Sequence, residues 1–303
     1  MRQELSILIP IFNHDVVPFV QQLHAQAVKA DIDFEILLFD DRSEEVYQQK
    51  NAVLSALPHV KIYQLPSKAG RSVARNFLAA QARFNYFLYV DCDSEMVDGH
   101  YLERYLSCCT GTEVVVCGGT AYRDQKPERD RLLRWTYGVK NETLPAAIRN
   151  RHPNDSFQAF NFLISKELFM EIRFNELLKN YGHEDTLFHY ELTQRGKRVL
   201  HIDNPLYHVG IDTNRVYLEK TRQGVENLKI LMESPESQQL ISHMRLVRYF
   251  RFFQKSRTVF LIFALYVLLQ KILLRQLNGR HPNMVLFNFY KLGYLCRLKY
   301  IKL

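Results

Sequence analysis

Apolar and polar stretches alternate along the first 120 residues in a pattern that predicts strands separated by helices. Short apolar runs with polar or turn residues at their ends predict buried strands at residues 5–10, 34–39, 60–64, 86–90 and 113–117. Helical spacing of apolar residues predicts helices between them, at residues 16–30, 44–57, 70–82 and 98–109, the last with Asp98 as its N-cap. Such alternation predicts βαβ units and a mainly parallel sheet covered by helices on both faces.

The pattern is less regular after residue 120. Residues 121–158 are polar and contain turn-forming prolines, which predicts a surface loop or lid. Further strands are predicted at residues 160–165 and 199–202, and further helices at residues 166–172 and 185–195. We therefore expect one α/β domain over residues 1–235 and a separate helical region over residues 236–303.

Charge separates the C-terminal region from the rest of the chain. The 303 residues carry a net charge of +8, but residues 241–303 hold twelve Lys or Arg and no Asp or Glu. The basic balance therefore belongs to this region and says little about the main domain. Arg245, Arg248, Arg251 and Lys255 recur every three or four residues, which predicts a helix with a basic stripe.

An uninterrupted apolar run, residues 259–269, follows the basic stripe. Only thirteen uncharged positions separate Arg257 from Lys271, whereas a helix that spans a bilayer needs about 20. The pattern therefore favours a helix that lies on an anionic membrane surface. A helical cap on the main domain and a contact between copies of the chain are the alternatives. Nucleic acid is not an expected partner, because the sequence has no nucleic-acid-binding motif.

The five cysteines include no CxxC pair, so the sequence predicts no zinc site. Their odd number and the lack of a secretory leader favour a reducing compartment. We therefore expect a cytoplasmic protein, attached to the inner face of the cell membrane.

Polar residues follow several predicted strands at the point where each strand ends. Asn13 follows the first strand, Asp40-Asp41 the second and Asp91-Cys92-Asp93 the fourth. Ligands of parallel sheets bind outside the carboxyl ends of the strands, and carboxylates two residues apart suit a divalent cation held against a phosphorylated ligand. Turns also place polar residues after strands, so the coincidence of several at one edge favours a site. A second acidic cluster, Glu184-Asp185, could supply a carboxylate base.

These motifs resemble those of the family 2 glycosyltransferases with a GT-A fold. The resemblance covers about residues 4–215 in matching order, through the segments Ser6 to Asn13, Glu35 to Ser43, Gly70 to Asn76, Asp91 to Asp93 and Gly182 to Asp185. It implies a mixed, mainly parallel GT-A sheet flanked by helices, with a helical C-terminal extension, and an enzyme of the hexosyltransferase type. The chain departs from the family at Arg42, because Gly is usual after the Asp pair.

The resemblance implies that the sheet edge binds a nucleotide sugar. The expected residues are Pro10, Phe12, Asn13, Asp41, Arg71, Arg75 and Asp91. Phe12 would border the base, and a core Phe is the alternative. Asp41 would accept a hydrogen bond from the base or the ribose, or would serve the first turn of a helix. Arg71 and Arg75 begin a helix whose N-terminus itself favours anions.

The resemblance also implies bound Mg²⁺ or Mn²⁺, which prefer hard oxygen ligands. Asp93 is the first expected ligand, and Asp91 would bind the metal through water or bind the ribose. His208 would complete the metal shell, with a purely structural His as the alternative. Cys92 points to the other side of the strand and is expected to pack.

Asp185 matches the general base of the family. It would take the proton of the acceptor hydroxyl. The resemblance then implies inversion of the configuration at the anomeric carbon. Glu184 would orient the acceptor or hold Asp185, and the alternative for both is an acidic helix N-terminus. Trp135 and Asn161 are candidate acceptor contacts, with core packing as the alternative for Trp135.

The sequence therefore predicts a metal-dependent, inverting glycosyltransferase that uses a nucleotide diphosphate donor, a UDP-sugar by expectation. A glycan or lipid-linked acceptor in surface polysaccharide synthesis is the expected second substrate. Two other classes stay open: a sugar-phosphate nucleotidyltransferase, and a non-catalytic membrane-attached scaffold that binds nucleotide sugars. A nucleotidyltransferase usually has a Gly-rich basic loop after its first strand, where this chain has Pro10 to Asn13.

Overall fold

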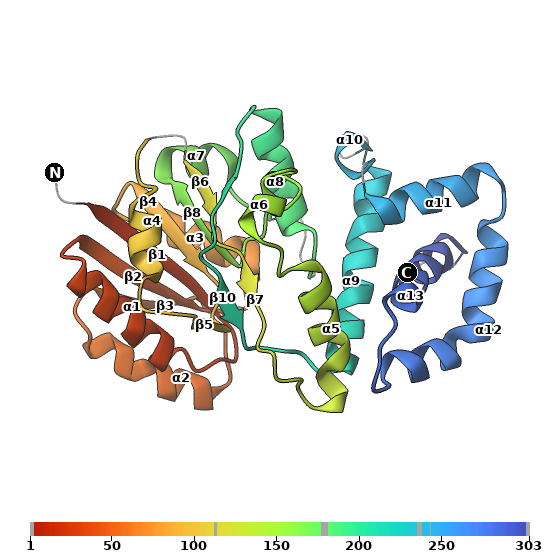
Figure 1. Cartoon of the computed structure of the whole chain (residues 1–303), viewed down its shortest axis with the longest axis horizontal. Helices are drawn as coiled ribbons and strands as arrows, with labels where there is room; N and C mark the ends of the chain where they lie inside the picture. Colours follow the sequence, from red (N-terminus) through yellow and green to blue (C-terminus); the bar gives the residue numbers. More distant parts are fainter. Residues whose placement is uncertain (1–2, 112–113, 177–180, 235–237, 243, 301–303) are drawn as a thin grey trace. The chain divides into compact units, whose positions relative to one another are not determined.

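A computed structural model describes residues 3–111, 114–176, 181–234, 238–242 and 244–300 (Figure 1). The chain forms two compact units that interleave along the sequence. Unit 1 takes residues 1–122, 142–177 and 184–210, and unit 2 takes residues 123–141, 178–183 and 211–303. The domain boundary predicted after residue 235 stays a prediction. Residue 113, in one predicted strand, lies outside the described residues.

Unit 1 is built on a seven-stranded sheet with the strand order β3-β2-β1-β4-β8-β6-β9. The strands are β1 (Glu4–Ile11), β2 (Asp33–Asp40), β3 (Val60–Gln64), β4 (Tyr86–Val90), β6 (Val115–Cys117), β8 (Asn161–Ser165) and β9 (Leu200–His201). Strand β8 runs antiparallel to β4 and β6, while β1–β2, β1–β4, β2–β3 and β6–β9 are parallel pairs. The predicted mixed, mainly parallel sheet is confirmed.

Helices cover both faces of this sheet. They are α1 (Val17–Lys29), α2 (Glu45–Ala52), α3 (Arg71–Gln81), α4 (Tyr101–Leu106), α6 (Ala146–Arg149), α7 (Lys166–Ile172) and α8 (Glu184–Gln194), with a 3-10 turn at Val53–Ala56. Ile7 of β1 belongs to the core that contains Leu23 of α1, whereas Leu8 belongs to the core that contains Leu78 of α3. Since successive side chains of a strand point to opposite faces, the apolar run of β1 is buried on both sides.

A second, three-stranded sheet with the order β5-β10-β7 was not predicted. Its strands are β5 (Ser94–Met96), β7 (Thr120–Ala121) and β10 (Leu206–His208). Strand β10 is antiparallel to β5, with His208 opposite Ser94, and parallel to β7. This sheet brings the chain after residue 205 back to the Asp91-Cys92-Asp93 segment.

Unit 2 is helical. Its helices are α5 (Leu132–Asn141), α9 (Asn214–Glu233), α10 (Gln238–Ile241), α11 (Arg245–Lys255), α12 (Val259–Leu277) and α13 (Met284–Tyr300), with a 3-10 turn at Arg129–Arg131. The ring of Tyr217 in α9 stacks on Phe287 of α13 with centroids 5.7 Å apart. Helices α12 and α13 approach closely at Gly293, where an added Cβ would lie 2.4 Å from the ring of Tyr266. The predicted helical C-terminal extension is confirmed.

Two local predictions were wrong. Helix α4 has His100 rather than Asp98 as its N-cap residue. The Asp98 carboxylate instead accepts from the His100 amide at 2.8 Å and from Arg104, and so closes the turn before the helix. The segment 121–158 is not an irregular loop, because it contains α5 and α6.

Candidate active site

The loops after β1 and β2 are tied together at the carboxyl edge of the large sheet. The Asn13 carboxamide accepts from the Glu44 amide at 2.8 Å, and the Ser43 hydroxyl accepts from the Asn13 amide at 2.9 Å. Asp40 accepts from the Ser43 amide at 2.8 Å. These bonds fix the loop after β1, and Pro10 lies within β1, one residue before its end.

Arg42 has a φ of 65°, in the left-handed region that Gly adopts without cost. The Gly expected here from the family resemblance would adopt this backbone without strain, while Arg42 leaves the neighbouring carboxylates in place.

Asp41 reaches from the end of β2 to the start of α3. Its carboxylate accepts from the amides of Ala69 and Gly70, the latter at 3.0 Å, and Asp41 is 7% exposed. Gly70 has a φ of 85°, so the turn into α3 needs Gly there. The contact of Asp41 with a base or ribose stays a prediction.

Phe12 stands at the surface, with 45% of its area exposed. The Lys68 ammonium lies 3.5 Å from the centroid of its ring, in a cation–π contact. A core position, the alternative for Phe12, is therefore wrong. One face of the ring is covered by Lys68, so a base that stacked on that face would displace the lysine.

Arg75 and Asp91 form a buried ion pair. The Arg75 Nη2 lies 2.8 Å from the Asp91 Oδ1, and Arg75 is 2% exposed. Within the described ranges, the Arg75 Nε and Nη1 atoms have no hydrogen-bond partner. Burial lowers the pKa of Arg75, but the carboxylates of Asp91, Asp185 and Glu184 outweigh it and raise the pKa overall. The guanidinium therefore stays charged, and two of its donor atoms are buried without a partner among the described residues.

The second acidic cluster lies in the first turn of α8. The Asp185 Oδ2 accepts from the Ala159 amide at 3.1 Å, and the Ala159 carbonyl lies 3.5 Å from the Arg75 Nη2. Glu184 lies 3.7 Å from the exposed Arg71 guanidinium. Loss of water around Asp185, and then the charge of Glu184, raise the pKa of Asp185 to about 6.

A continuous chain of contacts thus runs from Asp185 through Ala159 and Arg75 to Asp91. The two acidic clusters, far apart in the sequence, converge at one edge of the sheet within unit 1.

Asp93 and His208 face each other across the small sheet. The Asp93 Oδ2 lies 3.3 Å from the His208 Nε2, and the Val209 amide donates to the Asp93 carbonyl at 2.9 Å. Burial raises the pKa of Asp93, but His208, Arg71 and His14 together outweigh it and hold the pKa well below its usual range. Gly210 lies against this pair, since an added Cβ would be 2.4 Å from the Asp93 Oδ2.

The Asp93–His208 pair offers one carboxylate and one imidazole to a cation. Both groups are suitable ligands for Mn²⁺, and the carboxylate also suits Mg²⁺. Over the described ranges, no three His, Cys, Asp or Glu side chains come together in a metal-binding group. Asp91 is turned toward Arg75 instead. Asp93 and His208 are therefore the two residues that could hold Mg²⁺ or Mn²⁺ here.

Two further predicted positions, Trp135 and Asn161, are held by contacts within their own units. Trp135 belongs to unit 2, where its indole donates to the Arg123 carbonyl at 3.2 Å. Asn161 is 1% exposed, and its carboxamide bonds both Tyr101 and Tyr105 and two carbonyl oxygens. The acceptor roles of Trp135 and Asn161 stay predictions. Cys92 packs against the core, and burial raises its pKa to about 12, so it remains a thiol.

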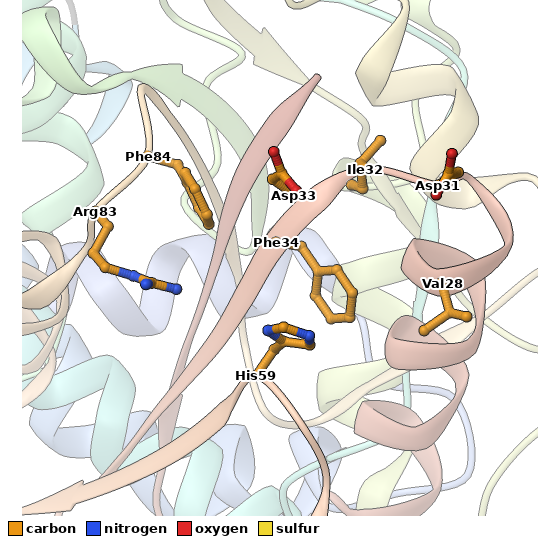
Figure 2. A pocket seen from close by; sticks show the side chains of 8 residues that line it. All are labelled: Val28, Asp31, Ile32, Asp33, Phe34, His59, Arg83 and Phe84. Carbon is orange, nitrogen blue, oxygen red and sulfur yellow. The ribbon is translucent and has the colours of Figure 1, made fainter. Parts of the chain in front are cut away.

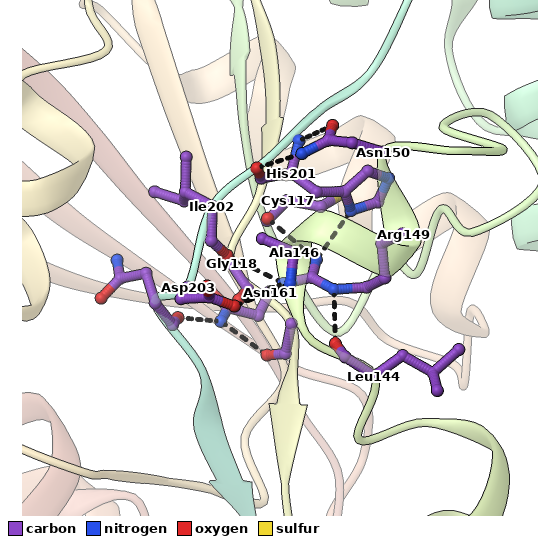
Figure 3. A network of polar contacts seen from close by, with 12 residues as sticks. Cys117, Gly118, Leu144, Ala146, Arg149, Asn150, Asn161, His201, Ile202 and Asp203 are labelled. Atoms are coloured by element: carbon purple, nitrogen blue, oxygen red, sulfur yellow. Dashed lines mark hydrogen bonds and ion pairs between the residues drawn. The ribbon is translucent and has the colours of Figure 1, made fainter.

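Arg149 is a buried arginine that was not among the predicted residues, and it binds the ends of β6 and β9 (Figure 3). The Arg149 guanidinium donates to the carbonyl oxygens of Leu144, Cys117, Gly118 and Ile202 at 2.8–3.2 Å. Its Nη1 also lies 2.7 Å from the His201 Nδ1. This network fixes the segment that leads into β10 and hence to His208. An Arg in a polar stretch of sequence is predicted to be an exposed surface residue, so no signal in the sequence identified Arg149 as buried.

A cavity of about 450 Å³ lies elsewhere in unit 1 (Figure 2). It is lined by Val28, Asp31, Ile32, Asp33, Phe34, His59, Arg83 and Phe84. Asp33 begins β2 whereas the predicted site follows its last residue, Asp40. This cavity is therefore at the amino end of the strand, away from the candidate active site.

A mixed, mainly parallel sheet with carboxylates gathered at its carboxyl edge is the arrangement expected of a GT-A glycosyltransferase. The chain belongs to this class by family as well, because residues 6–175 match the profile of glycosyl transferase family 2. It is therefore a glycosyltransferase.

Known relatives agree with this fold. An uncharacterized glycosyltransferase of Haemophilus influenzae is 22% identical over 196 residues, which cover 64% of this chain and 73% of the relative. The mannosyltransferase PcManGT of Pyrobaculum calidifontis, in complex with GDP-Man and Mn²⁺, is 12% identical, with a TM-score of 0.54 over 99% of this chain and 87% of its own.

Residues 1–349 of TarS from S. aureus are 16% identical, with a TM-score of 0.52 over 98% of this chain and 92% of that structure. The chain spans 42% of a longer TarS structure.

Proposed function

We propose that the chain is a metal-dependent, inverting glycosyltransferase that moves a sugar from a nucleoside diphosphate donor to a glycan or lipid-linked acceptor. The observation that supports this proposal is the convergence of the two acidic clusters. The Ala159 peptide binds Asp185 through its N–H and approaches Arg75 through its carbonyl, and Arg75 binds Asp91. A base and a phosphate-binding group are thereby available at one edge.

Asp185 is the proposed general base. With a pKa of about 6, it is mostly ionised at neutral pH and is still a better base than an ordinary carboxylate. The acceptor oxygen attacks the anomeric carbon from the side opposite the diphosphate, and its proton passes to Asp185. The bond between the anomeric carbon and the diphosphate oxygen breaks, so the configuration inverts.

The departing diphosphate needs positive charge and hydrogen-bond donors. Arg75 is proposed to stabilise this charge electrostatically from its buried position, and Arg71 at the start of α3 adds a second, exposed cation. Asp93 and His208 would hold Mg²⁺ or Mn²⁺, which when bound neutralises charge on the leaving group. Asp91 keeps Arg75 in position for this step.

The donor proposed is a UDP-sugar. One S. aureus TarS structure contains UDP-GlcNAc and the Pyrobaculum enzyme contains GDP-Man, which supports a nucleotide-sugar donor in general. We propose surface polysaccharide synthesis on the cytoplasmic face of the cell membrane as the setting, because nucleotide sugars and lipid-linked acceptors meet there.

Release of nucleoside diphosphate from a panel of UDP- and GDP-sugars tests this function. The purified chain is incubated with each donor, with Mn²⁺, with Mg²⁺ or with EDTA. We expect UDP from one UDP-sugar, and at least about tenfold less with EDTA because the leaving-group charge is then unshielded. Pyrophosphate formed from a sugar phosphate and a nucleoside triphosphate would indicate a nucleotidyltransferase instead. Nucleotide-sugar binding without any product would indicate a scaffold.

A further inference from the structure

Helix α12 exposes a row of large apolar side chains. Phe260, Leu261, Leu265, Leu268 and Ile272 are 57%, 63%, 43%, 77% and 64% exposed. Leu261, Leu265, Leu268 and Ile272 are separated by three or four residues, which puts them on one side of the helix, and Phe260 precedes Leu261 at its start. We call this set the α12 row. Single exposed apolar residues are common on soluble proteins, but a contiguous row of this size marks a contact surface.

The other side of α12 is firmly packed. Val259, Tyr266, Leu273 and Leu277 are buried in the core of unit 2. The contact of Tyr266 with Gly293 leaves no room for a Cβ, so α12 is seated directly on the backbone of α13. The exposed row is therefore the outer side of an anchored helix.

The preceding helix, α11, presents cations beside aromatic rings. Arg245, Arg248 and Lys255 are exposed, together with Tyr249 (61%) and Phe252 (64%). Val247 and Phe250 of the same helix are buried, so this is again the outer side. We call these five exposed residues the α11 face. Residues 256–258 join α11 directly to α12.

The charge of this region selects the partner. Segment 241–303 contains twelve Lys and Arg residues and no Asp or Glu. An apolar row that follows exposed cations in the chain complements a surface that is apolar below and anionic at its boundary, which is an anionic lipid bilayer. A second copy of the chain would bring the same cations together and is disfavoured by their repulsion.

The row favours a helix that lies on the membrane rather than one that crosses it. Among the helices in the described residues, α12 alone is long and apolar enough to span by length and composition. However, the thirteen uncharged positions from 258 to 270 make only about 20 Å of helix, against about 30 Å of hydrocarbon. Lys271 is exposed next to Ile272, and its stem can reach the headgroups from a shallow position.

We propose that the α12 row inserts into the boundary of an anionic lipid bilayer, while the α11 face holds the headgroups. This docking surface deepens the proposed position at the cell membrane and rests on that part of the proposed function. It needs no donor, metal or catalytic residue, so it can be tested separately from sugar transfer.

Sedimentation of the full chain with phosphatidylcholine vesicles, with and without phosphatidylserine, tests the row. In the double variant Leu265→Asp with Leu268→Asp, the partition coefficient of the chain between vesicles and water should fall by more than about tenfold. The reason is that two exposed leucines no longer insert into the bilayer. Val46→Asp with Val53→Asp is the matched control, because these valines are 52% and 59% exposed in unit 1. Equal binding by the row variant and the control would overturn the proposal.

The α11 face is tested by charge. Replacing Arg245, Arg248 and Lys255 with Gln should abolish the preference for phosphatidylserine and most of the salt dependence, while Lys29, Lys61 and Lys126 replaced with Gln should not. Retention of the preference in the α11 variant would contradict the proposed role of these cations.

Two further outcomes would also overturn the proposal. Vesicle-bound chain that resists alkaline carbonate extraction would show a span rather than surface docking. A dimer in analytical ultracentrifugation that the row variant dissociates, without any vesicle binding by the unaltered chain, would assign the row to a second copy. Release of nucleoside diphosphate, measured in the absence of vesicles, reports on the catalytic proposal independently.

Discussion

At the carboxyl edge of the large sheet, charged side chains are buried and matched with partners, whereas on the outer side of α12 apolar side chains are exposed. Arg75 is 2% exposed and pairs with Asp91, while Leu268 is 77% exposed. Neither arrangement maximises the stability of the folded chain. Burying charges costs solvation free energy, and exposed leucines contribute no free energy of burial. This difference supports the two proposals, a site for a phosphorylated small molecule in unit 1 and a docking surface for an extended apolar partner in unit 2.

The largest effect is expected at Asp185. Asp185→Asn keeps the size of the side chain but removes the base, so transfer should fall by about 10²- to 10⁴-fold. Because burial raises the pKa of Asp185 above that of an unfolded Asp, the charged form opposes folding at neutral pH. The variant should therefore melt at the same temperature or higher and still bind UDP. Glu191→Gln, at a half-buried position of the same helix where the carboxylate pairs with Arg195, is the control and should retain activity. Turnover of Asp185→Asn near that of the control would remove Asp185 from the role of base.

Gly210 allows a test of the Asp93–His208 pair and its proposed role in metal binding. In Gly210→Ala, the new Cβ would overlap the Asp93 carboxylate, so Asp93 or His208 must move. We expect the Mn²⁺ concentration for half-maximal activity to rise by about 10- to 100-fold, as for other disturbed metal sites. Gly99→Ala is the control, since nothing lies within 4 Å of its added Cβ. An unchanged Mn²⁺ requirement in Gly210→Ala would separate the Asp93–His208 pair from the metal.

The pH profile should show the base directly. Since Asp185 must be ionised to accept a proton, log(kcat/KM) should fall with unit slope below a pH of about 6 and level off above it. Stability has the opposite sign: the folded protein binds this proton more tightly than the unfolded chain, so the contribution of Asp185 falls as pH rises from about 4 to about 6. An acid limb with a midpoint near 4 in the activity profile would mean that the base is an ordinary, solvated carboxylate.

The smallest effect is expected at Arg42. Its left-handed backbone costs about 1 kcal/mol, part of which the extra freedom of unfolded Gly offsets, so Arg42→Gly should stabilise the fold by less than about 1 kcal/mol. Urea denaturation measures the change. His59→Gly is the comparison, because His59 has the same φ of 65°. Its ring packs on that of Phe34 with the centroids 5.0 Å apart, and this contact would be lost in the variant. A loss of stability in Arg42→Gly would show that the contacts of the Arg42 side chain contribute more free energy than its left-handed backbone costs.

The sequence predicted those parts of the fold that local pattern determines. The apolar runs of β1, β2 and β4 identify buried strands, and the polar residues after them mark the carboxyl edge. The small sheet escaped prediction because β5, β7 and β10 have only two or three residues each, and β10 pairs with segments about 100 residues earlier. Such strands depend on tertiary pairing more than on local propensity.

The candidate site was predictable in its residue types but not in its connections. The motifs pointed to Asp91, Asp93 and Asp185, yet the Ala159 peptide that links Asp185 to Arg75 has no side-chain signature. Arg149 was missed because burial, rather than spacing, distinguishes it from a surface arginine. The apolar run of α12 was evident from the sequence, but only packing on α13 shows which side remains exposed.

The most direct test of the central claim, that the two acidic clusters form one site, is the position of Mn²⁺ in crystals grown with UDP and MnCl₂. Anomalous diffraction should place the ion in contact with the Asp93 carboxylate and the His208 Nε2, with the diphosphate between it and Arg75 and with Asp185 facing the same opening. Nucleotide and Mn²⁺ bound elsewhere, for example in the cavity lined by His59 and Arg83, would contradict the account.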